Sequence, residues 1–251
     1  MNKAILSILI AGMSAGCGLI GNQPDGSGTI ECTQVQVAPQ VAGPILKLPP
    51  QEGDSIKKGA LVAQVDPRNY ELKKDEAQAA LRAAELDLKR IAQVFEKKTA
   101  TQKQMDDAQA AYDLASARFR LAEKALADCT ITAPLDGVVT LRSREEGEYV
   151  NPGMPIVTLS RLDEVWLSVY VPEDRLHRVK LGQTARVKLD GNPKFHEGKV
   201  TFISPEAEFT PKNVQTPDER AKLVYRVKIT LPNPDGIFKP GMPADGYLEG
   251  P

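Results

Sequence analysis

The sequence is poor in aromatic residues and has almost no excess of charge of either sign. Aromatic side chains make up 5% of the 251 residues, which is little for a protein that stacks nucleic-acid bases or sugar rings. The 32 basic and 33 acidic residues give a formal net charge of −1, so no basic stripe for phosphates is expected. We therefore expect no nucleic-acid partner.

Cysteine and histidine are also scarce, and they form no metal-binding or disulfide pattern. Cys17, Cys32 and Cys129 are an odd, sparse set without CxxC spacing, and His177 and His196 stand alone in polar surroundings. The sequence contains no phosphate-binding loop, catalytic triad or carboxylate-plus-metal motif. We therefore expect no metal, no cofactor and no catalytic residues, and hence a protein that is not an enzyme.

The N-terminus has the pattern of a bacterial export signal. Lys3 precedes a short apolar run, and small residues follow up to Cys17. The stretch Ser14–Cys17 resembles a lipobox, in which Cys17 becomes the lipidated first residue; simple cleavage and an uncleaved anchor are the alternatives. We assign residues 1–17 to the signal and 18–29 to a flexible tether. Each alternative places the mature chain outside the cytoplasm.

Two separated stretches of the chain repeat one pattern of glycine and apolar residues at an offset of 94. The matched positions are Gly43 and Gly137, Ile45 and Val139, Gly53 and Gly147, Ile56 and Val150, and Gly59 and Gly153. Glycines at this spacing are typical of tight turns between short strands. Each copy is only half a core and is too small to bury its apolar side alone.

The residues between the two copies show the heptad periodicity of two helices. Asp66 and Pro67 predict the start of the first helix. Apolar residues then recur at alternating steps of four and three, at Ala77, Leu81, Ala84, Leu88, Ile91 and Phe95, and again at Met105, Ala108, Tyr112, Ala115, Phe119, Ala122, Leu126 and Cys129. We predict an antiparallel coiled-coil hairpin over 67–129, roughly 45 Å long. Cys129 is interpreted as a small seam residue, and a disulfide with Cys32 is not expected.

The C-terminal part of the chain changes to β periodicity. Apolar residues alternate over Val165–Val171, and several further short strands surround one short helix at Pro172–Gly182. Five or six short strands with turn residues between them are typical of a small β-barrel or sandwich. We assign this part to 162–251.

This order of features resembles the periplasmic adaptor, or membrane fusion protein, family of the haemolysin-secretion D-like group. The resemblance implies an α+β fold in which 30–66 and 130–161 form one split lipoyl-like β-sandwich, with an inserted antiparallel α-helical coiled-coil hairpin, followed by a small β-barrel. The hairpin replaces the turn that carries the modified lysine of a true lipoyl domain, which argues against a carrier function. The family's membrane-proximal domain is expected to be reduced or missing.

The family's docking motif at the hairpin tip has a counterpart in Arg90, Val94 and Thr101. The spacing is kept, while Val replaces the usual Leu and Thr replaces the usual Ser. Arg can donate several directed hydrogen bonds, Val can fill a small groove and Thr keeps a hydroxyl. The resemblance implies that these residues dock on a TolC-like outer-membrane channel. The alternative is that Arg90 is a solvated helix residue and Val94 flanks the seam.

The resemblance also implies a function and a location. The chain is expected to be a periplasmic adaptor, anchored to the inner membrane of a Gram-negative bacterium by an N-terminal lipid or anchor. It would link an inner-membrane efflux transporter to the TolC-like channel as a homo-oligomer, a trimer or hexamer. The style of residues 65–81 favours an ABC-type over a proton-driven transporter. The alternatives are a type I-like protein-secretion adaptor and an envelope coiled-coil scaffold without a transport role.

Overall fold

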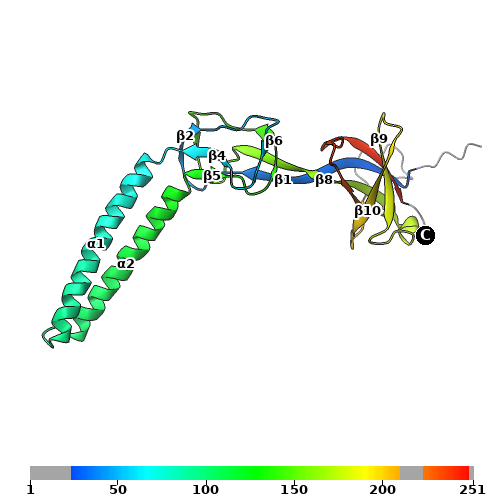
Figure 1. Ribbon diagram of the computed structural model, residues 1–251. Helices are drawn as coiled ribbons and strands as arrows, with labels where there is room; N and C mark the ends of the chain where they lie inside the picture. Colours follow the sequence, from blue (N-terminus) through cyan, green and yellow to red (C-terminus); the bar gives the residue numbers. More distant parts are fainter. Residues whose placement is uncertain (1–23, 210–222, 249–251) are drawn as a thin grey trace, which may run out of the picture.

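The computed structural model describes residues 24–209 and 223–248, which form three bodies in a row (Figure 1). A helical hairpin lies at one end, a β-sandwich in the middle and a β-barrel at the other end. Two long strands, β1 (Gly26–Val37) and β8 (Val157–Pro172), run from the barrel into the sandwich. The predicted α+β fold, with a split lipoyl-like sandwich, an inserted hairpin and a barrel, is confirmed.

The sandwich takes its short strands from both repeat copies. These strands are β2 (Gly43–Lys47), β3 (Ser55–Ile56), β4 (Leu61–Val65), β5 (Thr130–Thr132), β6 (Gly137–Arg142) and β7 (Tyr149–Val150). One sheet has the order β5-β4-β2-β7, and the other contains β3, β6, β8 and β1. Ile45 and Val65 from the first copy share one buried core with Val139 and Leu159 from the second. The two copies are therefore halves of a single body.

The backbone contacts between the halves obey the same offset of 94 as the sequence repeat. The Gly53 N–H donates to the Val139 carbonyl at 2.8 Å, and the Gly147 N–H donates to the Ile45 carbonyl at 2.8 Å. Both glycines have positive φ, +93° and +89°, which a side chain would strain. Each half thus supplies the turn that completes a strand of the other half.

Two glutamates repeat this exchange with their side chains. Glu52 accepts a hydrogen bond from the Arg142 backbone N–H at 2.9 Å. Its counterpart Glu146 accepts one from the Leu48 backbone N–H at 2.7 Å. Each carboxylate therefore binds a backbone donor of the opposite half.

The hairpin consists of α1 (Arg68–Glu96) and α2 (Gln102–Ala127). At 1.5 Å per residue, the 29-residue α1 is about 43 Å long. The helix start differs from the prediction by one residue: Pro67 occupies the N-cap position, and Asp66 accepts a hydrogen bond from the Arg68 backbone N–H at 3.0 Å. Asp66 therefore caps the helix from one residue further back than expected.

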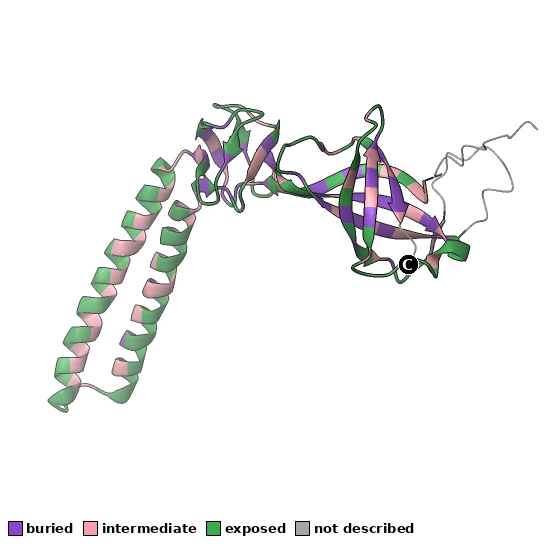
Figure 2. Cartoon of the chain, turned by 45° about the vertical axis from the view of Figure 1, so that its right-hand side comes forward, coloured by how far each residue is buried: buried purple, intermediate pink, exposed green. Residues whose placement is uncertain are grey.

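The predicted seam register agrees with the pattern of burial along both helices. The heptad residues of α1 are half-buried, and Ala108 and Ala115 are the buried residues of α2, while the outer faces are exposed (Figure 2). Cys129 corrects the sequence-based assignment, because it follows the end of α2 and packs in the sandwich core, 1% exposed. Cys32 and Cys129 are both buried and carry free thiols.

Six strands close the barrel in the order β12-β10-β9-β13-β1-β8, with β12 pairing back onto β8. The strands not yet given are β9 (Thr184–Leu189), β10 (Phe195–Ile203), β12 (Leu223–Pro232) and β13 (Pro243–Leu248), with β11 (Glu208–Phe209) beside β12 and the one-turn helix α3 (Glu173–Leu176) after β8. The tether assigned to 18–29 needs correction, because β1 begins at Gly26 and pairs with β13 from that residue. The first strand is therefore also a barrel strand.

The hairpin seam provides a direct test of this register. Ala115 is 8% exposed, so an Ala115→Glu substitution places a carboxylate between the helices without a partner. We expect the variant to lose about 3 kcal/mol of stability. Ala110→Glu is the matched control, because Ala110 lies exposed on the same helix. Circular-dichroism melts should separate the two variants, and equal melting curves would show that the register is wrong.

Candidate docking site at the hairpin tip

The turn between the helices is short and tightly closed. After α1, Lys98 adopts a left-handed conformation with φ of +59°, as residues that terminate helices often do. The backbone N–H of Thr99 donates to the Val94 carbonyl at 3.1 Å, and the Thr99 hydroxyl donates to the same carbonyl at 3.0 Å. The loop therefore supplies hydrogen-bond donors to a carbonyl in the last turn of α1, and these bonds give the tip a defined shape.

Thr101 is the N-cap of α2 and forms a capping box with Gln104. The Thr101 hydroxyl accepts a hydrogen bond from the Gln104 N–H at 3.3 Å, and the Thr101 N–H donates to the Gln104 side chain at 2.8 Å. The spacing of Thr and Gln is a capping-box pattern that the sequence already contains. Thr101 therefore has a structural role at the tip that the docking motif alone did not reveal.

Arg90 and Val94 lie one turn apart on α1 and are both exposed. Residues four apart share one face of a helix, so the two side chains are neighbours. Arg90 forms an ion pair with Asp87, one turn closer to the sandwich, but 73% of the Arg90 side chain stays accessible. An exposed pair of this kind contributes little and exchanges readily. The Arg90 guanidinium is thus available to a partner without breaking a buried contact.

A second ion pair follows directly on α2. Lys103 donates to Asp107 at 2.7 Å, and this hydrogen bond raises the pKa of Lys103 above its usual value. The positive charge of Lys103 is therefore retained at all physiological pH values. The tip presents positive groups on both helices, at Arg90 and at Lys103.

Four leucines lie outside the seam and face solvent along the hairpin. Leu72 and Leu86 on α1 are both 68% exposed, and Leu114 and Leu121 on α2 are 54% and 70% exposed. They are spaced by fourteen and by seven residues, so each pair follows one face of its helix. These leucines are not at the heptad positions through which α1 and α2 pack together. Regularly spaced exposed leucines are typical of a surface that packs against another helix.

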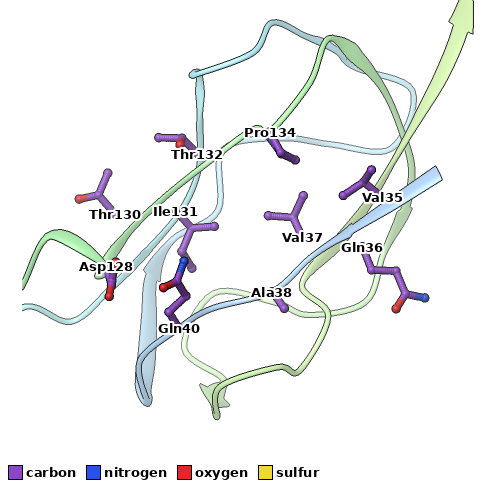
Figure 3. Close-up of a pocket in the computed structure, with 10 residues that line it drawn as sticks. All are labelled: Val35, Gln36, Val37, Ala38, Gln40, Asp128, Thr130, Ile131, Thr132 and Pro134. Atoms are coloured by element: carbon purple, nitrogen blue, oxygen red, sulfur yellow. The ribbon is translucent and has the colours of Figure 1, made fainter. Parts of the chain in front are cut away.

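The hairpin is rooted in the sandwich next to a shallow groove of about 420 Å³ between β1 and β5 (Figure 3). Val37 and Ile131 point toward one another across this groove, with polar side chains at its rim. Lys124 of α2 donates to Asp128 at 2.7 Å and to Gln40 at 3.2 Å. This contact connects the helix end to the loop after β1.

Where the hairpin joins the sandwich, Asp66 before α1 and Cys129 after α2 both have shifted pKa values. Hydrogen bonds from the Arg68 side chain, and then from its backbone, hold the pKa of Asp66 below its usual value. Burial raises the pKa of the Cys129 thiol, and the nearby carboxylate of Asp128 raises it further. Asp66 therefore stays ionised and Cys129 stays protonated at neutral pH, so both act as structural groups.

Within residues 24–209 and 223–248, no group of three or more His, Cys, Asp or Glu side chains is arranged to hold a metal ion. Across the same ranges, no helix combines the length and the apolar character that a membrane crossing requires. Cys17, the predicted lipidation site, lies outside the described residues.

A long molecule with an accessible helical tip at one end and a closed barrel at the other has the build of an adaptor that spans the distance between two partners (Figure 1). Residues 33–159 match the "RND MFP, barrel-sandwich hybrid domain", and residues 164–251 match the "CusB-like, beta-barrel domain". The chain belongs to the membrane fusion protein family. Members of this family are generally non-enzymatic adaptors of efflux systems, which pair an inner-membrane transporter with an outer-membrane channel.

Curated relatives and solved structures agree with this assignment. A "UPF0194 membrane protein YbhG" of Salmonella newport is 37% identical over 86% of each chain, and a UPF0194 membrane protein of Acidithiobacillus ferridurans is 33% identical over 88% of this chain and 85% of its own. A MacA-MexA chimeric protein with the Pseudomonas aeruginosa MexA hairpin has 27% identity and a TM-score of 0.77, over 90% of this chain and 81% of its own. ZneB from Cupriavidus metallidurans has 25% identity and a TM-score of 0.54, over 89% and 96%.

The capping role of Thr101 can be measured separately from docking. Thr101→Ala removes the hydroxyl that accepts from Gln104, and such a change costs about 1 kcal/mol of helix stability. Thr101→Ser keeps the hydroxyl and should melt as the wild type does. The measurement is thermal unfolding followed by the helical signal at 222 nm. An Ala variant as stable as the Ser variant would mean that the cap contributes nothing.

Proposed function

We propose that this chain is the periplasmic adaptor that links an inner-membrane efflux transporter to a TolC-like outer-membrane channel, with Arg90, Val94 and Thr101 as the docking residues. The observation that carries the proposal is the exposed pair of Arg90 and Val94 on one face at the far end of a hairpin about 43 Å long. A helical tip offers a partner helix both a directed cation and a small apolar contact. Thr101 contributes by capping α2 with its hydroxyl, and the residue itself is exposed at the tip.

The opposite end of the molecule supports an anchor on the inner membrane. β1 starts at Gly26 in the barrel, on the far side from the hairpin (Figure 1). The chain between Cys17 and Gly26 can span at most about 30 Å, because each residue adds no more than about 3.5 Å. Lipidation at Cys17, or an uncleaved anchor, therefore holds the barrel near the inner membrane and directs the hairpin into the periplasm.

The exposed leucines support a homo-oligomer, a trimer or hexamer, in which hairpins stand side by side. Leu86 lies ten residues before the end of α1, and Leu114 lies twelve residues after the start of α2. Measured along the helix axes, the distances of Leu86 and Leu114 from the tip thus differ by about 3 Å. When copies stand in parallel around a ring, α1 of one copy meets α2 of the next, and these leucines meet at the same level.

We favour an ABC-type transporter over a proton-driven one as the inner-membrane partner. The support is the sequence at the start of the hairpin, residues 65–81, which resembles that of adaptors that work with ABC-type transporters. This choice decides the energy source: the adaptor itself contributes position and contact, while the transporter performs the work.

A crosslinking experiment tests the docking residues. A photoreactive amino acid at position 101 of the full chain should capture an outer-membrane channel of the TolC kind in intact cells. Arg90→Ala should abolish both the capture and export, because the directed hydrogen bonds of the guanidinium are lost. Helicity and melting temperature should stay near wild type, since Arg90 is exposed.

Lys89→Ala is the matched control, because Lys89 is also exposed and charged but lies on another face of α1. It should leave capture and export unchanged. Wild-type export by the Arg90 variant would remove the docking assignment. Capture of peptidoglycan alone from position 101 would instead indicate a scaffold without a transport role.

The leucine stripe leads to a separate test of assembly. Leu114→Glu places a charge on the face that meets the neighbouring hairpin, so we expect a shift from oligomer to monomer of at least about tenfold in dissociation constant. Arg120→Glu changes an exposed side chain of the same helix on another face and should leave assembly unchanged. Sedimentation velocity of the detergent-solubilised chain distinguishes these outcomes, and equal distributions would exclude the stripe from the interface.

A further inference from the structure

β1 and β8 form the ribbon that passes from the barrel core to the sandwich core. Ile30 and Cys32 of β1 belong to the barrel core, whereas Val37 belongs to the sandwich core. Successive side chains of a strand point to opposite faces, so even-numbered and odd-numbered residues of β1 serve different bodies. The ribbon therefore offers one face to the barrel and the opposite face to the sandwich.

The pairing of the two strands shifts at this crossing. Cys32 pairs with Val165 but the next residue, Thr33, pairs with Arg161, so 162–164 of β8 have no partner on β1. Three inserted residues, an odd number, reverse the side of the strand on which odd-numbered side chains of β8 lie. Odd-numbered residues therefore face the barrel core after the bulge, as Val165 does, and the sandwich core before it, as Leu159 does. Extra residues of this kind bend a strand and increase its twist. The conformation of this bulge therefore sets the direction in which the sandwich leaves the barrel.

One buried side chain holds the bulge from the barrel side. β12 pairs with β8 as far as Pro232 and Glu164, which brings Asn233 alongside the bulge. The Asn233 side-chain amide donates to the Leu162 carbonyl at 2.7 Å, and its backbone N–H donates to the Asp163 carbonyl at 2.8 Å. Two of the three inserted residues are thus bound through their backbones to one asparagine.

The remaining hydrogen-bonding capacity of Asn233 fixes the asparagine itself. Its amide also donates to the Phe238 carbonyl at 2.9 Å, and its side-chain oxygen accepts from the Phe238 N–H at 3.0 Å. Asn233 is 4% exposed and Phe238 is 2% exposed, with the Phe238 ring inside the barrel core. A fully bonded, buried amide has little freedom to move, since any lost bond leaves a desolvated polar group.

We propose that Asn233 is a positioning residue, which holds the bulge at 162–164 in one conformation and so fixes the angle between barrel and sandwich. Asn233 is buried and acts through the backbone of β8. The consequence is largest at the tip, because a rotation displaces a point in proportion to its distance from the joint, and the tip lies beyond the sandwich at the end of a hairpin about 43 Å long. This geometric role stands independently of which channel or transporter the adaptor binds.

The test measures the distance between the two bodies by double electron–electron resonance on the full chain. Genetically encoded nitroxide amino acids at exposed Lys58 in the sandwich and Lys194 in the barrel report the angle, and a pair at Lys180 and Lys194 reports the barrel alone. In Asn233→Ala we expect the distribution between the bodies to broaden at least about twofold, with the barrel distribution unchanged.

Asn233→Asp is the second variant, because it keeps the acceptor for the Phe238 N–H and removes the donor to the Leu162 carbonyl. It should broaden the same distribution. Asp163→Ala is the matched control, since it changes an exposed bulge side chain and leaves both carbonyl acceptors in place. Unchanged widths in both Asn233 variants would overturn the proposal. Equal broadening within the barrel would also overturn it, because Asn233 would then hold the barrel rather than the angle.

Discussion

The whole structure depends on each repeat copy being completed by the other. Glu52 and Glu146 exchange hydrogen bonds with backbone donors of the opposite half, and the glycine turns do the same with carbonyls. Neither half can bury its apolar residues or satisfy its turns alone, so the two fold only together. The copies are offset by 94 residues in sequence. When they associate, the chain between them, which forms the two helices, must leave the sandwich and return to it at neighbouring strands.

That place determines the form of the hairpin. The two helices start and end on neighbouring strands, β4 and β5, which pair directly through Gln64 and Thr130. Paired strands lie about 4.8 Å apart, whereas packed helix axes lie 8–10 Å apart. Small buried seam residues such as Ala108 and Ala115 allow the helices to remain close between the middle of the hairpin and its tip. The tip residues are consequently held at a fixed distance from the sandwich, while their side chains stay accessible.

At the other side of the sandwich, the ribbon of β1 and β8 is the joint that connects the sandwich to the barrel. β1 and β8 each serve two cores, and the barrel closes around their outer halves. A two-stranded ribbon resists bending only as far as its backbone is held, and here two of the three inserted residues of β8 are bound by Asn233. The barrel, the joint, the sandwich and the hairpin follow one another along the molecule. The position of the tip relative to the barrel therefore depends on the angle at each connection between them.

The sequence by itself determined what local periodicity and self-similarity encode: the repeated half-cores, the heptad register through Ala115 and the β character of the C-terminal part. Only the tertiary structure decided what contacts distant in sequence control. Cys129 continues the heptad in sequence yet packs in the sandwich, and Gly26 begins a barrel strand within a stretch that reads as tether. The link from Asn233 to Leu162 crosses 71 residues and carries no pattern at all. The physical reason is that periodicity reports which face of an element is buried, but not which body buries it.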